Sequence, residues 1–160
     1  GLGSCTRNTG KVSEQSCNGV GSCFENSGDI SSFSCIEKAS CSQNRGDISE
    51  NSCTTDRACG RNRGDVQENS CVGRYACTLS EGAIGTGSCH GDSSCYANTG
   101  DIGQDSCEGT LACDENQGVV GIGSCHGGSS CIRNFGMVGD GSCLGRFTCA
   151  ENGGDIGQDS

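Results

Sequence analysis

The chain has 160 residues and a formal net charge of −10 at pH 7, with 29 glycines, 17 cysteines and no proline. Its few large apolar side chains exclude an ordinary hydrophobic core, because the surface they could bury would not offset the entropy of the chain. The acidic balance argues against a nucleic-acid partner, and no apolar run is long enough to span a membrane. Because cysteine exceeds roughly 8–10% of the chain, we expect cross-links in an oxidising, extracellular compartment.

The cysteines repeat with a period of 18 residues and no insertion. The first series comprises Cys5, Cys23, Cys41, Cys59, Cys77, Cys95, Cys113, Cys131 and Cys149. The second comprises Cys17, Cys35, Cys53, Cys71, Cys89, Cys107, Cys125 and Cys143. Such regularity predicts structural units of one length stacked in register, so that equivalent residues form columns. The sequence begins at Gly1, and we expect a processed product or a piece of a longer chain.

Four further columns follow the same period, in this order along each unit. The asparagine column, interrupted only by Ser80, comprises Asn8, Asn26, Asn44, Asn62, Asn98, Asn116, Asn134 and Asn152. The glycine column runs from Gly10 to Gly154, the valine/isoleucine column from Val12 to Ile156 and the serine column from Ser16 to Ser160, each at every eighteenth residue. We expect the glycines at a corner, the β-branched residues on a buried strand and the asparagine amides in a hydrogen-bonded structural ladder.

These columns predict an all-β fold. A helix is excluded because glycine recurs too often and no apolar face has a spacing of 3.6 residues. We predict a single-stranded β-solenoid, or β-helix, of about nine 18-residue coils, three-sided and with an internal disulfide ladder. Residues 1–160 would form one repeat domain, part of a longer chain or filament.

Disulfides explain the cysteine spacing better than zinc, because every short interval is C-x5-C and no C-x-x-C pair occurs. We predict no metal and no cofactor. Bridges across each coil would join Cys17–Cys23, Cys35–Cys41, Cys53–Cys59, Cys71–Cys77, Cys89–Cys95, Cys107–Cys113, Cys125–Cys131 and Cys143–Cys149, leaving Cys5 unpaired. Pairing over the twelve-residue interval would leave Cys149 unpaired instead, and spacing alone does not decide between the two.

Several stretches resemble known repeat families. IGQDSC at 102–107, VGIGSC at 120–125 and VGDGSC at 138–143 resemble the [IV]-G-x-x-S motif of hexapeptide-repeat β-helices. The C-x5-C in every coil is similar to disulfide-laddered insect antifreeze solenoids. The whole pattern, as in DIGQDSCEGTLACDENQG at 101–118, looks most like cysteine-rich extracellular repeat proteins of diatoms and related microalgae. The resemblance implies a stacked repeat and little chemistry.

No residue pattern indicates an enzyme. His90 and His126, the only histidines, lie two coils apart, and no phosphate loop or nucleophile motif occurs, so we predict no catalytic residues. An aspartate column, Asp29, Asp47, Asp65, Asp101 and Asp155, lacks the spacing of calcium-binding β-rolls. We expect these carboxylates to bond a turn.

The sequence therefore predicts a structural protein: a stiff, disulfide-stabilised extracellular rod or filament of a cell surface, appendage or matrix. Its partner would be another copy joined end to end, or neighbouring repeats of a longer chain. One alternative is an ice-binding solenoid, although no outward column of threonines occurs. A second is an adhesive or ligand-binding module that uses the scattered surface aromatics.

Overall fold

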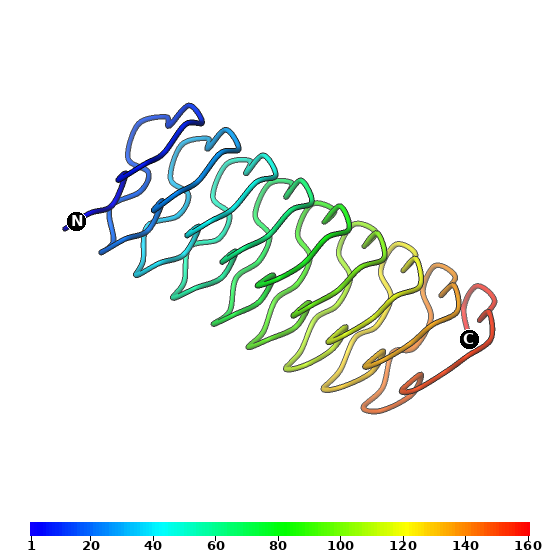
Figure 1. Ribbon diagram of the computed structural model, residues 1–160. Coiled ribbons are helices and arrows are strands. Elements are labelled where there is room, and N and C mark those ends of the chain that lie inside the picture. Colours follow the sequence, from blue (N-terminus) through cyan, green and yellow to red (C-terminus); the bar gives the residue numbers. More distant parts are fainter.

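The computed structural model describes residues 1–160 and shows a stack of similar coils that advances steadily from the N-terminus to the C-terminus (Figure 1). Each coil occupies 18 residues, so equivalent residues of successive coils lie in register. The stack contains no helix and no extended strand, only turns, bends and isolated bridges. The molecule is therefore elongated, and each coil contacts the coils before and after it.

The predicted all-β class is wrong. One residue of each coil pairs in the manner of a β-strand, and that residue always belongs to the valine/isoleucine column. The eight parallel bridges are Val12–Ile30, Ile30–Ile48, Ile48–Val66, Val66–Ile84, Ile84–Ile102, Ile102–Val120, Val120–Val138 and Val138–Ile156. Isolated bridges of this kind build no sheet, so the flat sides of a three-sided β-solenoid do not form.

The backbone dihedral angles explain why strands are absent. Four positions of every coil have a positive φ in the left-handed region, as at Asn51 (56°), Cys53 (54°), Arg57 (55°) and Arg61 (58°). Each such residue reverses the local direction of the chain, whereas a strand needs successive residues in the extended region. The coil is thus a series of tight turns joined by short extended links.

Backbone hydrogen bonds nevertheless connect the coils. Of the 91 bonds between backbone groups, most link residues of neighbouring coils. The amide of Cys23 donates to the carbonyl of Ser4 at 2.7 Å, and the amide of Ser13 donates to the carbonyl of Ile30 at 2.8 Å. Donors and acceptors therefore alternate between the two neighbours of a coil, which satisfies the backbone without a sheet.

The core consists of 26 buried residues, and most of them are disulfide-bonded cysteines. The others are the buried members of the valine/isoleucine column together with Ala58, Ala76 and Ala112. Stacked sulfur atoms thus occupy the space that leucine and phenylalanine side chains fill in an ordinary domain, which accounts for the low aliphatic content of the sequence.

The glycine column forms a corner where the backbones of successive coils approach closely. A Cβ atom on Gly64 would overlap the carbonyl group of Gly82 in the next coil and would lie 2.9 Å from the carbonyl oxygen of Glu81. The same overlap recurs from Gly10 to Gly136. Any side chain at this corner would push two coils apart.

We predict that Gly64→Ala destabilises the protein by about 3 kcal/mol, because the added methyl group meets backbone that cannot move independently. The matched control is Gly60→Ala, four residues away, where the nearest atom to an added Cβ lies 3.7 Å off. That change should alter stability by less than about 0.5 kcal/mol. Guanidinium denaturation of the oxidised protein, followed by circular dichroism, measures both. Equal midpoints for the two variants would contradict the close approach at this corner.

Candidate functional site

The structure closes every complete coil with a disulfide between cysteines six residues apart. The bonded pairs are Cys17–Cys23, Cys35–Cys41, Cys53–Cys59, Cys71–Cys77, Cys89–Cys95, Cys107–Cys113, Cys125–Cys131 and Cys143–Cys149. Their Cα atoms lie 5.5 to 5.7 Å apart, within the ordinary range for disulfides. Cys5 is exposed and not bonded.

The turn between two bonded cysteines brings them together. In the segment from Cys53 to Cys59, left-handed residues at Cys53 and Arg57 fold the chain back on itself, and the two Cα atoms come to 5.6 Å. Because the same angles recur at each equivalent pair, one local geometry is repeated along the interior.

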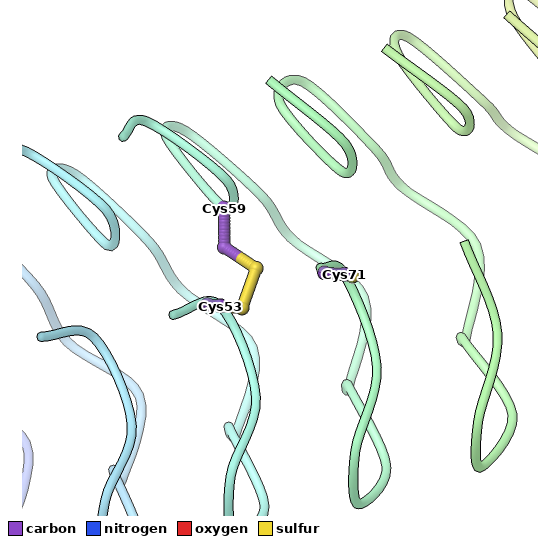
Figure 2. A group of neighbouring side chains, drawn as sticks. All are labelled: Cys53, Cys59 and Cys71. Atoms are coloured by element: carbon purple, nitrogen blue, oxygen red, sulfur yellow. A yellow bond between two sulfur atoms is a disulfide. The ribbon is translucent and has the colours of Figure 1, made fainter. Parts of the chain in front are cut away.

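Neighbouring bridges lie close to one another. Figure 2 shows the sulfur–sulfur bond of Cys53 and Cys59 beside Cys71 of the next coil, and the sulfur atoms of these three residues lie within 4.8 Å of one another. Such a cluster resembles a metal site in its residue types. A metal needs thiolates, however, and sulfur atoms bonded in pairs do not supply them.

The asparagine column forms hydrogen bonds between coils. Each Nδ2 group donates to the carbonyl of the glycine two residues later. Where the preceding coil also has asparagine, the same group donates to its Oδ1 at 2.8 to 3.1 Å. Ser80 breaks this ladder, because its hydroxyl is too short to make either bond. The Oδ1 of Asn62 and the Oγ of Ser80 are consequently buried without a partner.

The serine column forms a second polar ladder whose role the sequence did not reveal. Ser34 Oγ donates to the carbonyl of Ser49 at 2.8 Å and accepts the amide of Ser52 at 3.1 Å. Equivalent bonds recur at the hydroxyls from Ser16 to Ser142. A hydroxyl both donates and accepts, so one small side chain joins two coils at this buried position. The sequence signal for this ladder was that serine occupies the same position in every coil.

The aspartate column bonds backbone. Asp47 Oδ1 accepts the amide of Asp29 at 2.8 Å, and Asp65 Oδ1 accepts the amide of Asp47 at 2.9 Å. Asp29, Asp101 and Asp155 make the equivalent bond to residues 11, 83 and 137. Each carboxylate thus stabilises the turn of the preceding coil, which explains the column without calcium.

The two histidines do not form a shared site. The Nε2 atom of His90 lies 2.7 Å from the carbonyl oxygen of Asn69, and that of His126 lies 2.7 Å from the carbonyl oxygen of Asp105. Each ring is thus bonded to the turn of the preceding coil. The two make the same structural contact at separate places.

Surface charges also pair along the stack. Hydrogen bonds from Gln43 and Arg7 lower the pKa of Glu25, and Arg133 lies between Glu115 and Glu151. Burial, together with the nearby charge of Glu115, raises the pKa of Asp114 to about 6. These interactions are local and join one coil to the next.

The disulfides, the stacked columns and the coil geometry define a disulfide-rich tandem-repeat protein. The chain belongs to the family described as a domain of unknown function (DUF7640), whose model matches residues 1–94 and again residues 87–160. No curated protein and no solved structure matches the chain. The resemblance to microalgal, antifreeze and hexapeptide repeats therefore stays a prediction. Bridges of this number fit an oxidising environment, and no helix is long and apolar enough to cross a membrane.

Ser80→Asn should repair the asparagine ladder. The new amide would donate to the Oδ1 of Asn62 and to the carbonyl of Gly82, and it would accept the Nδ2 of Asn98. We expect a gain of about 1 kcal/mol, since a buried unpaired acceptor becomes bonded. Ser80→Ala is the control, because it fills no gap and makes no bond. Guanidinium denaturation of both variants measures the difference, and a destabilised Ser80→Asn protein would contradict this account of the ladder.

Trypsin digestion without reduction distinguishes the two pairing schemes, because arginines separate the cysteines of the third and fourth coils. Bridges within coils join peptide 46–57, which contains Cys53, to peptide 58–61. The twelve-residue scheme would instead join 46–57 to 39–45 and join 58–61 to 64–74. We expect the first product in mass spectra recorded after free thiols are blocked at acidic pH. The second pair of products would contradict the ladder.

Proposed function

We propose that the chain is a stiff structural element of an extracellular surface, appendage or matrix and that it has no catalytic role. The proposal rests on one observation, a difference between the buried and the exposed columns. The columns that keep one residue type are buried and bonded to the next coil, namely the cysteine, asparagine, serine and valine/isoleucine columns. The exposed columns vary in size and charge. Constant buried columns beneath variable exposed ones support a role that depends on an unbroken stack of coils.

Covalent closure makes such a stack durable. Each short bridge contributes about 2 kcal/mol by restricting the unfolded chain, and the core has one in every complete coil. The backbone and side-chain ladders then join the coils, so opening one coil would break many hydrogen bonds at once. Stiffness and resistance to proteolysis are the properties that this arrangement favours.

End-to-end association is part of the proposal. Every interior coil presents donors and acceptors to the coil before it and the coil after it in the same pattern. A coil of a second copy would meet the same pattern. Residues 1–80 also carry eight basic and nine acidic side chains, whereas residues 81–160 carry two and eleven. The two halves thus carry net charges of −1 and −9, so opposite ends repel each other less than two C-terminal ends would.

The first test combines location with thiol state. Immunogold labelling of the native source should place the protein outside the cell, on a surface or in a matrix. Protein extracted with blocked thiols should contain no more than one free thiol per chain, and it should survive proteolysis that destroys the reduced form. Label confined to the cytosol, together with reduced cysteines, would overturn the proposed function.

Association is tested separately by sedimentation velocity over a range of concentrations and salt. We expect linear oligomers that grow with concentration and that sodium chloride does not dissociate, because salt screens the repulsion between acidic chains. A monomer at every concentration would remove the filament from the proposal.

A further inference from the structure

Two neighbouring hollows lie on the surface between Glu25 and Tyr96. Two hollows of about 340 Å³ each adjoin there, and both are lined by Gln43, Arg61 and Leu79. We call the pair the arginine groove. Its first hollow is also lined by Glu25, Ser27, Arg45, Arg63 and Glu81. Its second is also lined by Ala39, Ser42, Arg57, Gly60, Tyr75, Thr78 and Tyr96.

A missing side chain opens the second hollow. Ser42, Gly60 and Thr78 occupy equivalent places in three successive coils, and only the middle one lacks a side chain. A Cβ atom at Gly60 would have no neighbour nearer than 3.7 Å. This glycine is therefore not required by the backbone, in contrast with Gly64 at the corner, and its effect is to leave space between the flanking side chains.

The groove concentrates positive charge on an acidic protein. Arg45, Arg61 and Arg63 line the first hollow, although the chain has only ten basic residues against twenty acidic ones. Arg63 pairs with Glu81, and Arg61 uses only its Nε, which donates to Gln43 Oε1 at 3.0 Å. The terminal nitrogens of Arg61 and the whole guanidinium of Arg45 have no partner within the protein. They are free to donate to an anion.

The other side of the groove is aromatic. Tyr75 and Tyr96 are the only tyrosines of the chain, and both line the second hollow. Arg57 lies over the ring of Tyr75, 5.6 Å from its centroid, and donates to its hydroxyl at 2.6 Å. This contact fixes Tyr75, while the ring of Tyr96 has no such cover. Ser42 adds a hydroxyl that bonds no other side chain or backbone group.

We propose that the arginine groove binds a short segment of an acidic polysaccharide whose sugars carry carboxylate or sulfate groups. Guanidinium groups bind such oxyanions through two parallel hydrogen bonds. A tyrosine ring offers an apolar face to a sugar ring, and the nearby hydroxyl and amide groups match sugar hydroxyls. Glu25 and Glu81 lie at the two ends of the first hollow and limit its length. The groove therefore accommodates a few sugar units and is too short to hold a second rod along its side.

This inference goes beyond the proposed structural role, because it supplies an attachment point between the rod and a charged matrix. It is tested by isothermal titration calorimetry on the oxidised protein with three probes: a polyuronate oligosaccharide, a sulfated oligosaccharide and a neutral glucan oligosaccharide. We expect at least one acidic probe to bind, more weakly as salt is added, and the neutral probe to bind at least about tenfold more weakly. The two acidic probes distinguish carboxylate from sulfate.

Two variants locate the site. Arg61→Gln removes the central guanidinium, and Gly60→Thr fills the hollow with the residue found at position 78 while leaving the charge unchanged. Each should weaken binding about tenfold or more. Arg133→Gln is the matched control, since Arg133 is equivalent to Arg61 in a distant coil and makes surface ion pairs. The control should bind like the unaltered protein. Circular dichroism and the count of blocked thiols verify that all three variants are folded and oxidised.

The proposal is overturned if neither acidic probe binds, if Arg61→Gln and Gly60→Thr both bind normally, or if Arg133→Gln weakens binding as much as they do. It is also overturned if the two groove variants abolish association between copies of the chain while sugar binding is undetectable, because the groove would then hold protein. None of these results bears on the location and thiol state of the rod, so the two proposals fail independently.

Discussion

The structure depends on one constraint: most bonded backbone groups must meet their partners in a neighbouring coil, one 18-residue repeat away. Since backbone groups at fixed places in each coil bond fixed places in the coil before or after it, a single inserted residue would misalign the bonds around it. This explains why the cysteine spacing has no exception. It also explains why the side-chain ladders consist of residues whose groups both donate and accept. Asparagine donates to the preceding coil and accepts from the next one, whereas each serine hydroxyl donates to and accepts from the next coil, as Ser34 does with Ser49 and Ser52.

The same constraint accounts for what could be predicted. A period and its columns are visible in the sequence because every coil repeats the same environment, so the buried positions and the asparagine contacts could be inferred from repetition alone. The serine column was equally visible. Its bonding pattern was not, since the partner of Ser34 is the carbonyl of Ser49, fifteen residues on, and only the path of the coil brings the two together.

The prediction of an all-β fold was wrong because the residue types do not reveal which backbone positions are left-handed. Left-handed backbone positions are usually occupied by glycine or asparagine. Here one left-handed column holds residues as different as Ala39, Arg57 and Leu111. A β-branched column beside a glycine column then looks like a strand and its corner, although each Val or Ile is a single extended residue between turns. The arginine groove escaped prediction too, because its residues come from columns that keep no residue type.

The cost of these turns indicates why the cysteines are needed. A left-handed non-glycine residue costs roughly 1–2 kcal/mol, and every coil contains several, so the coil conformation is unfavourable for an isolated segment. The bridge from Cys53 to Cys59 spans a segment that contains two such residues, Cys53 and Arg57. It offsets part of their cost by removing open conformations from the unfolded chain. Stacking offsets the rest through bonds that only neighbouring coils provide. A coil is therefore stable because it is closed and because it has neighbours, and this dependence leaves the exposed columns free to vary. Surface features such as the arginine groove could then arise on a few coils without disturbing the stack beneath them.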